Sequence, residues 1–266
     1  MTSALPDIRE VRVGAILALR EEYRREMNCQ IVHDSWHARG FTRSFLFTVA
    51  EQAVGYGSVG GVQEDPKTIV KEFFLLPQYR ELAEPLFPHL VAVSGATTVE
   101  AQTNDTLLSR MLEAFATDLT SDTILFSDAV ETHLDAPDVK FGPIGMLDRL
   151  RMFRHTVEPV GDWGLKMNSS VVATGGLLFH YNPPYGDIYM EVAAPFRRRG
   201  YGSYLVQEVK RICREGGHVP AARTSTDNEA SRRTLERAGM IQCGKIVTGS
   251  LAATRGSSRS RGSLGS

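Results

Sequence analysis

Short apolar runs alternate with segments of helical periodicity along the chain. The apolar runs predict strands at residues 41–50, 53–62, 68–76, 97–102, 123–130, 188–194, 221–226 and 240–247, with two more strands within 165–179. Apolar positions at helical spacing predict helices at residues 13–27, 81–93, 107–116, 146–155, 202–215 and 228–239. This alternation predicts an α/β fold in which helices flank a central sheet.

The order of elements repeats once along the chain. Residues 53–77 resemble residues 173–195, and Glu72 falls against Glu191 at an offset of 191 − 72 = 119. Leu112 falls against Leu235 at an offset of 235 − 112 = 123, together with their flanking residues. Two nearly equal offsets predict a duplicated unit. The alternative is that two ordinary α/β segments align this well by chance.

Composition divides the chain into three parts. Residues 135–145 are rich in Pro, Gly and Asp and predict a boundary. We therefore expect a first half at residues 1–134 and a second half at residues 135–253. Residues 254–266 are almost all Ser, Gly and Arg, which predicts a disordered tail.

The most informative stretch begins with the strand at residues 188–194. The segment Arg197-Arg198-Arg199-Gly200-Tyr201-Gly202-Ser203 follows it and leads into a helix. The first N–H groups of a helix lack partners and carry partial positive charge, and glycine lets a ligand approach the backbone closely. Arginines add charge and planar donors. The stretch therefore predicts a phosphate site, although a solvated surface is the simpler alternative for the arginines alone.

Two common phosphate loops do not fit this turn. No Gly-Lys-Ser or Gly-Lys-Thr ends it, and the third glycine of the dinucleotide fingerprint is missing. The spacing Arg197-x-x-Gly200-x-Gly202, preceded by Val192-x-x-Pro195, resembles the acyl-CoA turn of the GCN5-related N-acetyltransferases (GNAT). Asp227-Asn228 and, further on, Ala238-Gly239-Met240 resemble that family's downstream signature.

The resemblance implies a GNAT fold with two GNAT-like halves and N-acetyl transfer from acetyl-CoA to a primary amine. It implies that the second half holds the coenzyme, without a metal, at the end of the strand, at the turn and at the start of the last helix. The implied binding residues are Met190, Val192, Arg197, Arg198, Arg199, Gly200, Tyr201, Gly202, Ser203 and Asn228. The alternative to a coenzyme contact of Asn228 is that this residue only caps the helix. The first half has Pro77-Gln78-Tyr79-Arg80-Glu81 in place of the glycine turn, so we expect it not to bind the coenzyme.

The catalytic groups are less clear. Strand alternation puts Asp187, Tyr189 and Glu191 on one face, and Glu191 is the candidate base, with a structural carboxylate as the alternative. Leu235 stands where the family often has a thiolate-protonating tyrosine. Because leucine cannot donate a proton, a second hypothesis is that the chain is a CoA-binding sensor or scaffold without catalysis.

The net charge of −1 and the lack of interleaved aromatic residues disfavour nucleic-acid binding, and no apolar stretch predicts a membrane helix. Cys29, Cys213 and Cys243 fit neither a zinc spacing nor a disulfide framework, so we expect free thiols in the cytoplasm. His33 and His37 have a spacing that could suit a metal, but ordinary histidines are the simpler interpretation. We expect a small-molecule or peptide amine as the acceptor and a monomer or homodimer.

Overall fold

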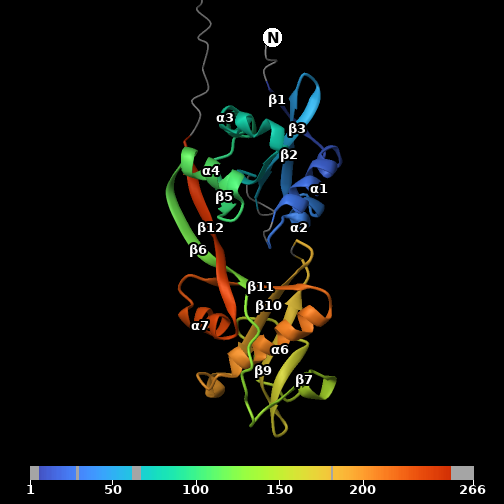
Figure 1. Cartoon of the computed structure of the whole chain (residues 1–266), viewed down its shortest axis with the longest axis vertical. Coiled ribbons are helices and arrows are strands. Elements are labelled where there is room, and N and C mark those ends of the chain that lie inside the picture. The colour runs from blue at the N-terminus through green and yellow to red at the C-terminus, as the bar shows by residue number, and fades with distance from the viewer. Residues whose placement is uncertain (1–5, 28–29, 62–66, 181, 253–266) are drawn as a thin grey trace, which may run out of the picture.

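The computed structural model describes residues 6–27, 30–61, 67–180 and 182–252, which form one twelve-stranded sheet with helices on it (Figure 1). The strands are β1 (Asp7–Val11), β2 (Thr42–Val49), β3 (Gln52–Gly60), β4 (Ile69–Leu75), β5 (Thr98–Gln102), β6 (Ala116–Asp128), β7 (Lys140–Pro143), β8 (Trp163–Met167), β9 (Ser170–Leu178), β10 (Tyr185–Val192), β11 (Val219–Ser225) and β12 (Met240–Leu251). The α-helices are α1 (Leu17–Glu26), α2 (Asp34–Ala38), α3 (Ala83–Ser94), α4 (Thr106–Phe115), α5 (Met146–Arg149), α6 (Tyr201–Glu215) and α7 (Glu229–Arg237). Short 3-10 helices are η1 (Val13–Ile16), η2 (Pro77–Leu82) and η3 (Ala194–Phe196).

The strand order has the same pattern from either end of the sheet. It runs β1-β2-β3-β4-β5-β12-β6-β11-β10-β9-β8-β7. In each half the fourth strand pairs parallel with the fifth, β4 with β5 and β10 with β11, and the other neighbours are antiparallel. This symmetry favours the duplicated unit over two unrelated α/β segments.

The last strand of each half pairs with the other half. β6 follows α4 along the chain but pairs with β11, and β12 follows α7 but pairs with β5. β6 and β12 also pair with each other, and both run between the two lobes of the molecule (Figure 1). Each lobe therefore needs a strand from the other half to complete its sheet.

Each lobe has its own apolar core. In the first lobe, Phe45, Phe47, Phe73 and Phe87 are fully buried between the sheet and α3. In the second lobe, one side of α6 packs on the sheet through Leu205, Val206 and Val209. Complete burial of such a side chain contributes about 1.5–3 kcal/mol, so α6 is fixed firmly in place and with it the turn at its start.

Three sequence-based expectations need correction. The helix predicted at residues 146–155 is only the four-residue α5, and Met146, Leu147 and Leu150 are 75–83% exposed because no sheet face lies under them. The strand predicted at 123–130 begins at Ala116, since the polar stretch before it bridges the lobes and shows no alternation.

The match of Glu72 to Glu191 is displaced by two residues. Leu76 N–H donates to Val54 O, and Ala193 N–H makes the corresponding bond to Val172 O, each at 2.9 Å. Counting back from these anchors puts Glu72 in register with Tyr189, at an offset of 189 − 72 = 117. Both positions face the same side of the sheet, which explains why the two-residue displacement is not visible in the sequence pattern.

Other expectations concern thiols, metals and membranes. Cys213 and Cys243 are free thiols, whereas Cys29 and the tail at 254–266 lie outside the described residues. The described part of the chain contains no cluster of His, Cys, Asp and Glu that could hold a metal ion, and His37 instead contacts Glu72 at 3.1 Å. Within that part, every helix is too short or too polar to span a membrane.

Candidate functional site

A wedge opens between β10 and β11. The two strands pair only from Tyr185–Val219 to Asp187–Ala221, and beyond that point β11 continues its pairing with β6 on its other edge. Since Ala193 N–H donates toward β9, strand alternation turns the N–H groups of Val192 and Met190 toward the wedge. An extended ligand in the wedge could therefore pair with β10 as an added strand.

The glycine-bearing turn closes the same end of β10. After η3, Arg198 and Gly200 take positive φ angles of 63° and 86°, and Gly200 is the N-cap of α6. The N-cap Gly200 has no side chain with which to cap the helix, so the first N–H groups of α6 are open to a ligand. Gly202 is needed for packing as well, because a Cβ there would lie 3.1 Å from Thr234 Cγ2 and 3.4 Å from Met190 Cε.

The arginines of the turn have distinct positions. Arg197 Nε donates to Val192 O at 3.0 Å, so this side chain holds the end of β10. The Arg199 guanidinium lies over the Phe196 ring at 5.4 Å from its centroid. Arg198 is exposed. The turn thus carries charge around a backbone cradle whose shape is fixed partly by Arg197.

Sequence reasoning missed Arg237, a further cation at this turn. Arg237 lies in the last turn of α7, and a Cβ built on Gly200 would be 3.8 Å from either terminal guanidinium nitrogen of Arg237. Its position 37 residues after Gly200 gave no local signal. Packing of α7 beside α6 brings the two together.

Other predicted site residues contribute through backbone or caps. Tyr201 is buried and its hydroxyl donates to Asp138, which raises the pKa of Tyr201; the Ser203 side chain is also buried. These two residues can offer a ligand their main chain. Asn228 is exposed and caps α7, its Oδ1 accepting from Ser231 N at 3.0 Å. A contact of Asn228 with a coenzyme stays a prediction.

Glu191 is held by backbone donors and is 6% exposed. Its carboxylate accepts from the N–H groups of Thr156, Val157 and Glu158 at 3.0–3.2 Å and from Thr156 Oγ1 at 3.0 Å. Burial raises the pKa of Glu191, but these hydrogen bonds outweigh it and hold the pKa below its ordinary value. A carboxylate in this state is a weak base, and its bonds fix the segment 156–158 against the sheet. The structural-carboxylate alternative gains support, with backbone amides and one hydroxyl as the partners of the carboxylate.

Glu158 and Tyr189 are titratable groups on the same side of the sheet. Burial and the nearby Glu191 raise the pKa of Glu158, against the lowering effect of Arg223. Burial also raises the pKa of Tyr189. A carboxylate with a raised pKa is a stronger base than Glu191, so Glu158 is the stronger proton acceptor of the two.

Leu235 is buried in the second core, 4% exposed. The position that the sequence resemblance associates with a proton donor is therefore occupied by a packing residue. Among the described residues, this structure offers no tyrosine at that place.

The first half lacks the same cradle. Its counterpart of the turn is η2, which begins at Pro77 and contains no glycine. The wedge between β4 and β5 is also present, with pairing only at Ile69–Thr98 and Val70–Val99, but Tyr23 of α1 reaches to Asp105 at the start of α4. Helix α1 thus borders the wedge of the first half. In the second half the short α5 is not a counterpart of α1.

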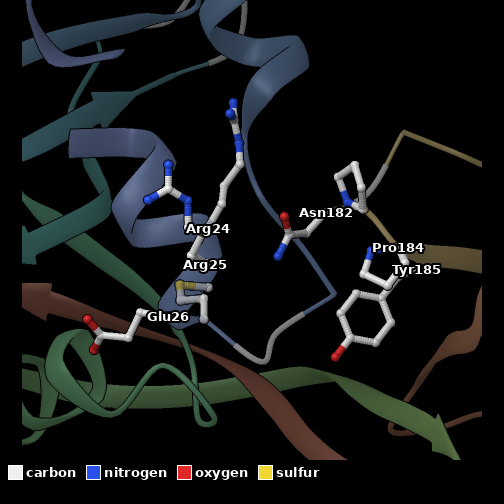
Figure 2. A pocket seen from close by; sticks show the side chains of 8 residues that line it. Arg24, Arg25, Glu26, Asn182, Pro184 and Tyr185 are labelled. Carbon is white, nitrogen blue, oxygen red and sulfur yellow. The ribbon is translucent and has the colours of Figure 1, made fainter. Parts of the chain in front are cut away.

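A pocket of about 310 Å³ lies elsewhere, between the lobes. Figure 2 shows the end of α1, with Arg24, Arg25 and Glu26, facing the turn that carries Asn182, Pro184 and Tyr185. Tyr185 begins β10, whereas the glycine turn follows its end, so this pocket is at the opposite end of the strand. It is not part of the candidate site.

Comparisons with known proteins agree with this geometry. Residues 127–240 match the family described as Acetyltransferase (GNAT). A GNAT-family acetyltransferase from Colwellia psychrerythraea superposes with a TM-score of 0.70 at 14% identity, covering 92% of this chain and 100% of its own. A GCN5-related N-acetyltransferase from Sphaerobacter thermophilus gives 0.55 at 14% identity, covering 91% and 94%.

A tandem GNAT protein from the clavulanic acid biosynthesis pathway gives a TM-score of 0.53 at 10% identity, covering 94% of this chain and 100% of its own. No curated protein sequence matches the chain. These superpositions show that the fold is the GNAT fold.

Proposed function

We propose that the chain is an N-acyltransferase that uses acetyl-CoA and a primary amine, a proposal supported by the match of residues 127–240 to the Acetyltransferase (GNAT) family. The observation that carries the proposal is the joint position of two unsatisfied backbone surfaces. The open edge of β10 and the uncapped start of α6 lie at the same end of the second lobe. A ligand with an extended amide-rich arm and a diphosphate satisfies both.

The residues divide between the two ends of such a ligand. The N–H groups of residues 198–203 would hold the diphosphate, with Arg198, Arg199 and Arg237 adding charge. Met190 and Val192 would pair with the pantetheine arm. The coenzyme supplies an activated acyl group as a thioester.

The same edge of β10 provides an oxyanion donor. As a neutral amine attacks, its nitrogen bonds to the acyl carbon, the C–S bond breaks and the thiolate takes a proton. The Val192 N–H, directed into the wedge, would stabilise the oxygen on which charge develops. We propose that Glu158 accepts the amine proton, directly or through water, and that Glu191 positions the segment that carries Glu158.

The second candidate is a CoA-binding module without turnover. It is favoured by Leu235 in the core and by the fully hydrogen-bonded carboxylate of Glu191. Both candidates require the coenzyme to bind, and they differ in whether thiol is released.

The experiment has two stages on the full chain. Calorimetry with CoA and with acetyl-CoA tests binding, and a thiol assay with acetyl-CoA and a panel of primary amines then tests turnover. Binding with amine-dependent thiol release supports the transferase. Binding without release by any amine supports the module, and no binding removes both.

A further inference from the structure

A second cavity lies in the first half, at the wedge between β4 and β5. It measures about 180 Å³ and is bordered by α1, β4, η2 and the start of α4. At about 30 Å³ per water, this is the volume of roughly six waters, which suits a ligand of a few heavy atoms.

Asp105 is a buried carboxylate that lines this cavity. It is 5% exposed; its Oδ1 accepts from Leu108 N at 3.1 Å, its Oδ2 accepts from the Tyr23 hydroxyl at 3.1 Å, and the Leu107 N–H is a further donor to the carboxylate. A carboxylate has about four acceptor positions, so these donors leave room for another. A buried carboxylate favours a cation as its partner.

Within the described residues, no cationic side chain forms an ion pair with Asp105. The Arg80 guanidinium, which lines the cavity, pairs with Glu26, and the Arg20 guanidinium pairs with Glu72 at 2.9 Å and with Asp34 at 2.8 Å. Because the charges of Arg80 and Glu26, which both line the cavity, cancel, the cavity carries one negative charge when Asp105 is ionised.

Aromatic side chains form part of the remaining wall. Tyr23, Phe73 and Phe74 line the cavity, and the Tyr23 and Phe74 rings meet edge to face at 5.8 Å. Aromatic faces attract cations and exclude water from an alkyl group. A buried carboxylate among aromatic rings matches an ammonium on a short apolar group.

We propose that this cavity binds a small organic cation, a primary ammonium whose charge is held by Asp105. The site lies in the half without the glycine turn, so it does not depend on coenzyme binding. It gives the first half a ligand of its own.

The simpler interpretation is that Asp105 only caps α4, stabilised by the helix N-terminus. Burial raises the pKa of Asp105 to about 6, against the lowering effect of its N–H and O–H donors. The donors thus compensate the buried negative charge only in part. A bound cation would complete this compensation.

Calorimetry on the full chain with n-butylammonium tests the proposal, with n-butanol as the neutral isostere. We expect butylammonium to bind at pH 7.5 at least tenfold more tightly than butanol. Asp105→Asn keeps the cap, since Asn caps as well as Asp, and loses the charge; we expect a tenfold or greater loss of affinity. Asp227→Asn, at the corresponding junction before α7, is the matched control and should bind as the wild type does.

The affinity of the wild type for butylammonium, measured as a function of pH, tests the proposal without a variant. The groups facing Asp105 are Tyr23 and Glu26 on α1, Glu72 on β4 and Arg80 in η2. Butylammonium stays charged between pH 5 and 7.5, while Asp105 takes up a proton, so we expect roughly tenfold weaker binding at pH 5. Absence of butylammonium binding, equal affinity for butanol, or unchanged affinity in Asp105→Asn would overturn the proposal.

Discussion

Gly200→Ala isolates the contribution of the turn to coenzyme binding. Gly200 has a φ of 86°, and a Cβ there would find its nearest neighbours at 3.8 Å, the Arg237 guanidinium nitrogens. The substitution therefore creates no clash within the protein. It adds backbone strain and places a methyl group between the N–H cradle and Arg237.

The two effects have separate magnitudes. A left-handed conformation costs a non-glycine residue about 1–2 kcal/mol, which at roughly 2–4 °C per kcal/mol lowers the melting temperature by about 2–8 °C. If the proposed N–H cradle holds the diphosphate, the methyl group would stand in its way. We expect the affinity for CoA to fall at least tenfold, equivalent to about 1.4 kcal/mol.

Gly217→Ala is the matched control. Gly217 lies just past the other end of α6, has a φ of 77° and has open space around its Cβ position. Thermal melts should show similar losses for both variants, while calorimetry with CoA should show weaker binding only for Gly200→Ala. Unchanged CoA affinity in Gly200→Ala, or an equal loss in Gly217→Ala, would refute the reasoning.

Three further predictions concern buried groups. Glu72→Gln removes one of the two carboxylates that pair with the buried Arg20 guanidinium, the one at 2.9 Å, and leaves Asp34 at 2.8 Å; we expect a loss of about 1.5–3 kcal/mol in urea unfolding. Glu10→Gln in the exposed pair with Arg43 should cost less than about 1 kcal/mol, and equal losses would contradict this. Leu235→Tyr should overpack the core, lowering stability by about 1–3 kcal/mol without faster thiol release, and a rate increase would show that position 235 reaches the site. Because its folded pKa lies below the ordinary value, ionised Glu191 stabilises the fold above the unfolded pKa, and this stabilisation disappears as pH falls through the folded pKa; Glu191→Gln should flatten the acid end of a stability profile, and an unchanged profile would argue against the hydrogen bonds described.

Most of the long elements were predictable because apolar periodicity is local, whereas the short β1, α2 and β7 were not predicted. Helix α6 and its turn follow directly from residues 188–215, and the cap role of Asn228 follows from its place before a periodic segment. The exchange of β6 and β12 between lobes was not predictable. Which strand a strand pairs with depends on the whole sheet, and neither strand carries a residue that specifies its partner.

The site was predictable only where one segment forms it. The turn at 197–203 is contiguous, so its residues indicated its chemistry. Arg237 reaches Gly200 by helix packing, and the donors to Glu191 come from residues 156–158, a stretch without periodic pattern. Contacts between distant segments of this kind need the fold.

The central claim is that backbone N–H groups of the turn and of the β10 edge hold the coenzyme. Amide spectra of the ¹⁵N-labelled full chain, titrated with CoA, test it most directly. We predict that the largest shifts fall on residues 198–203 and on Met190 and Val192, while the corresponding residues of η2 and β4 stay unchanged. Saturable CoA binding that leaves the amides of the turn unmoved, or shifts confined to the first half, would contradict the account.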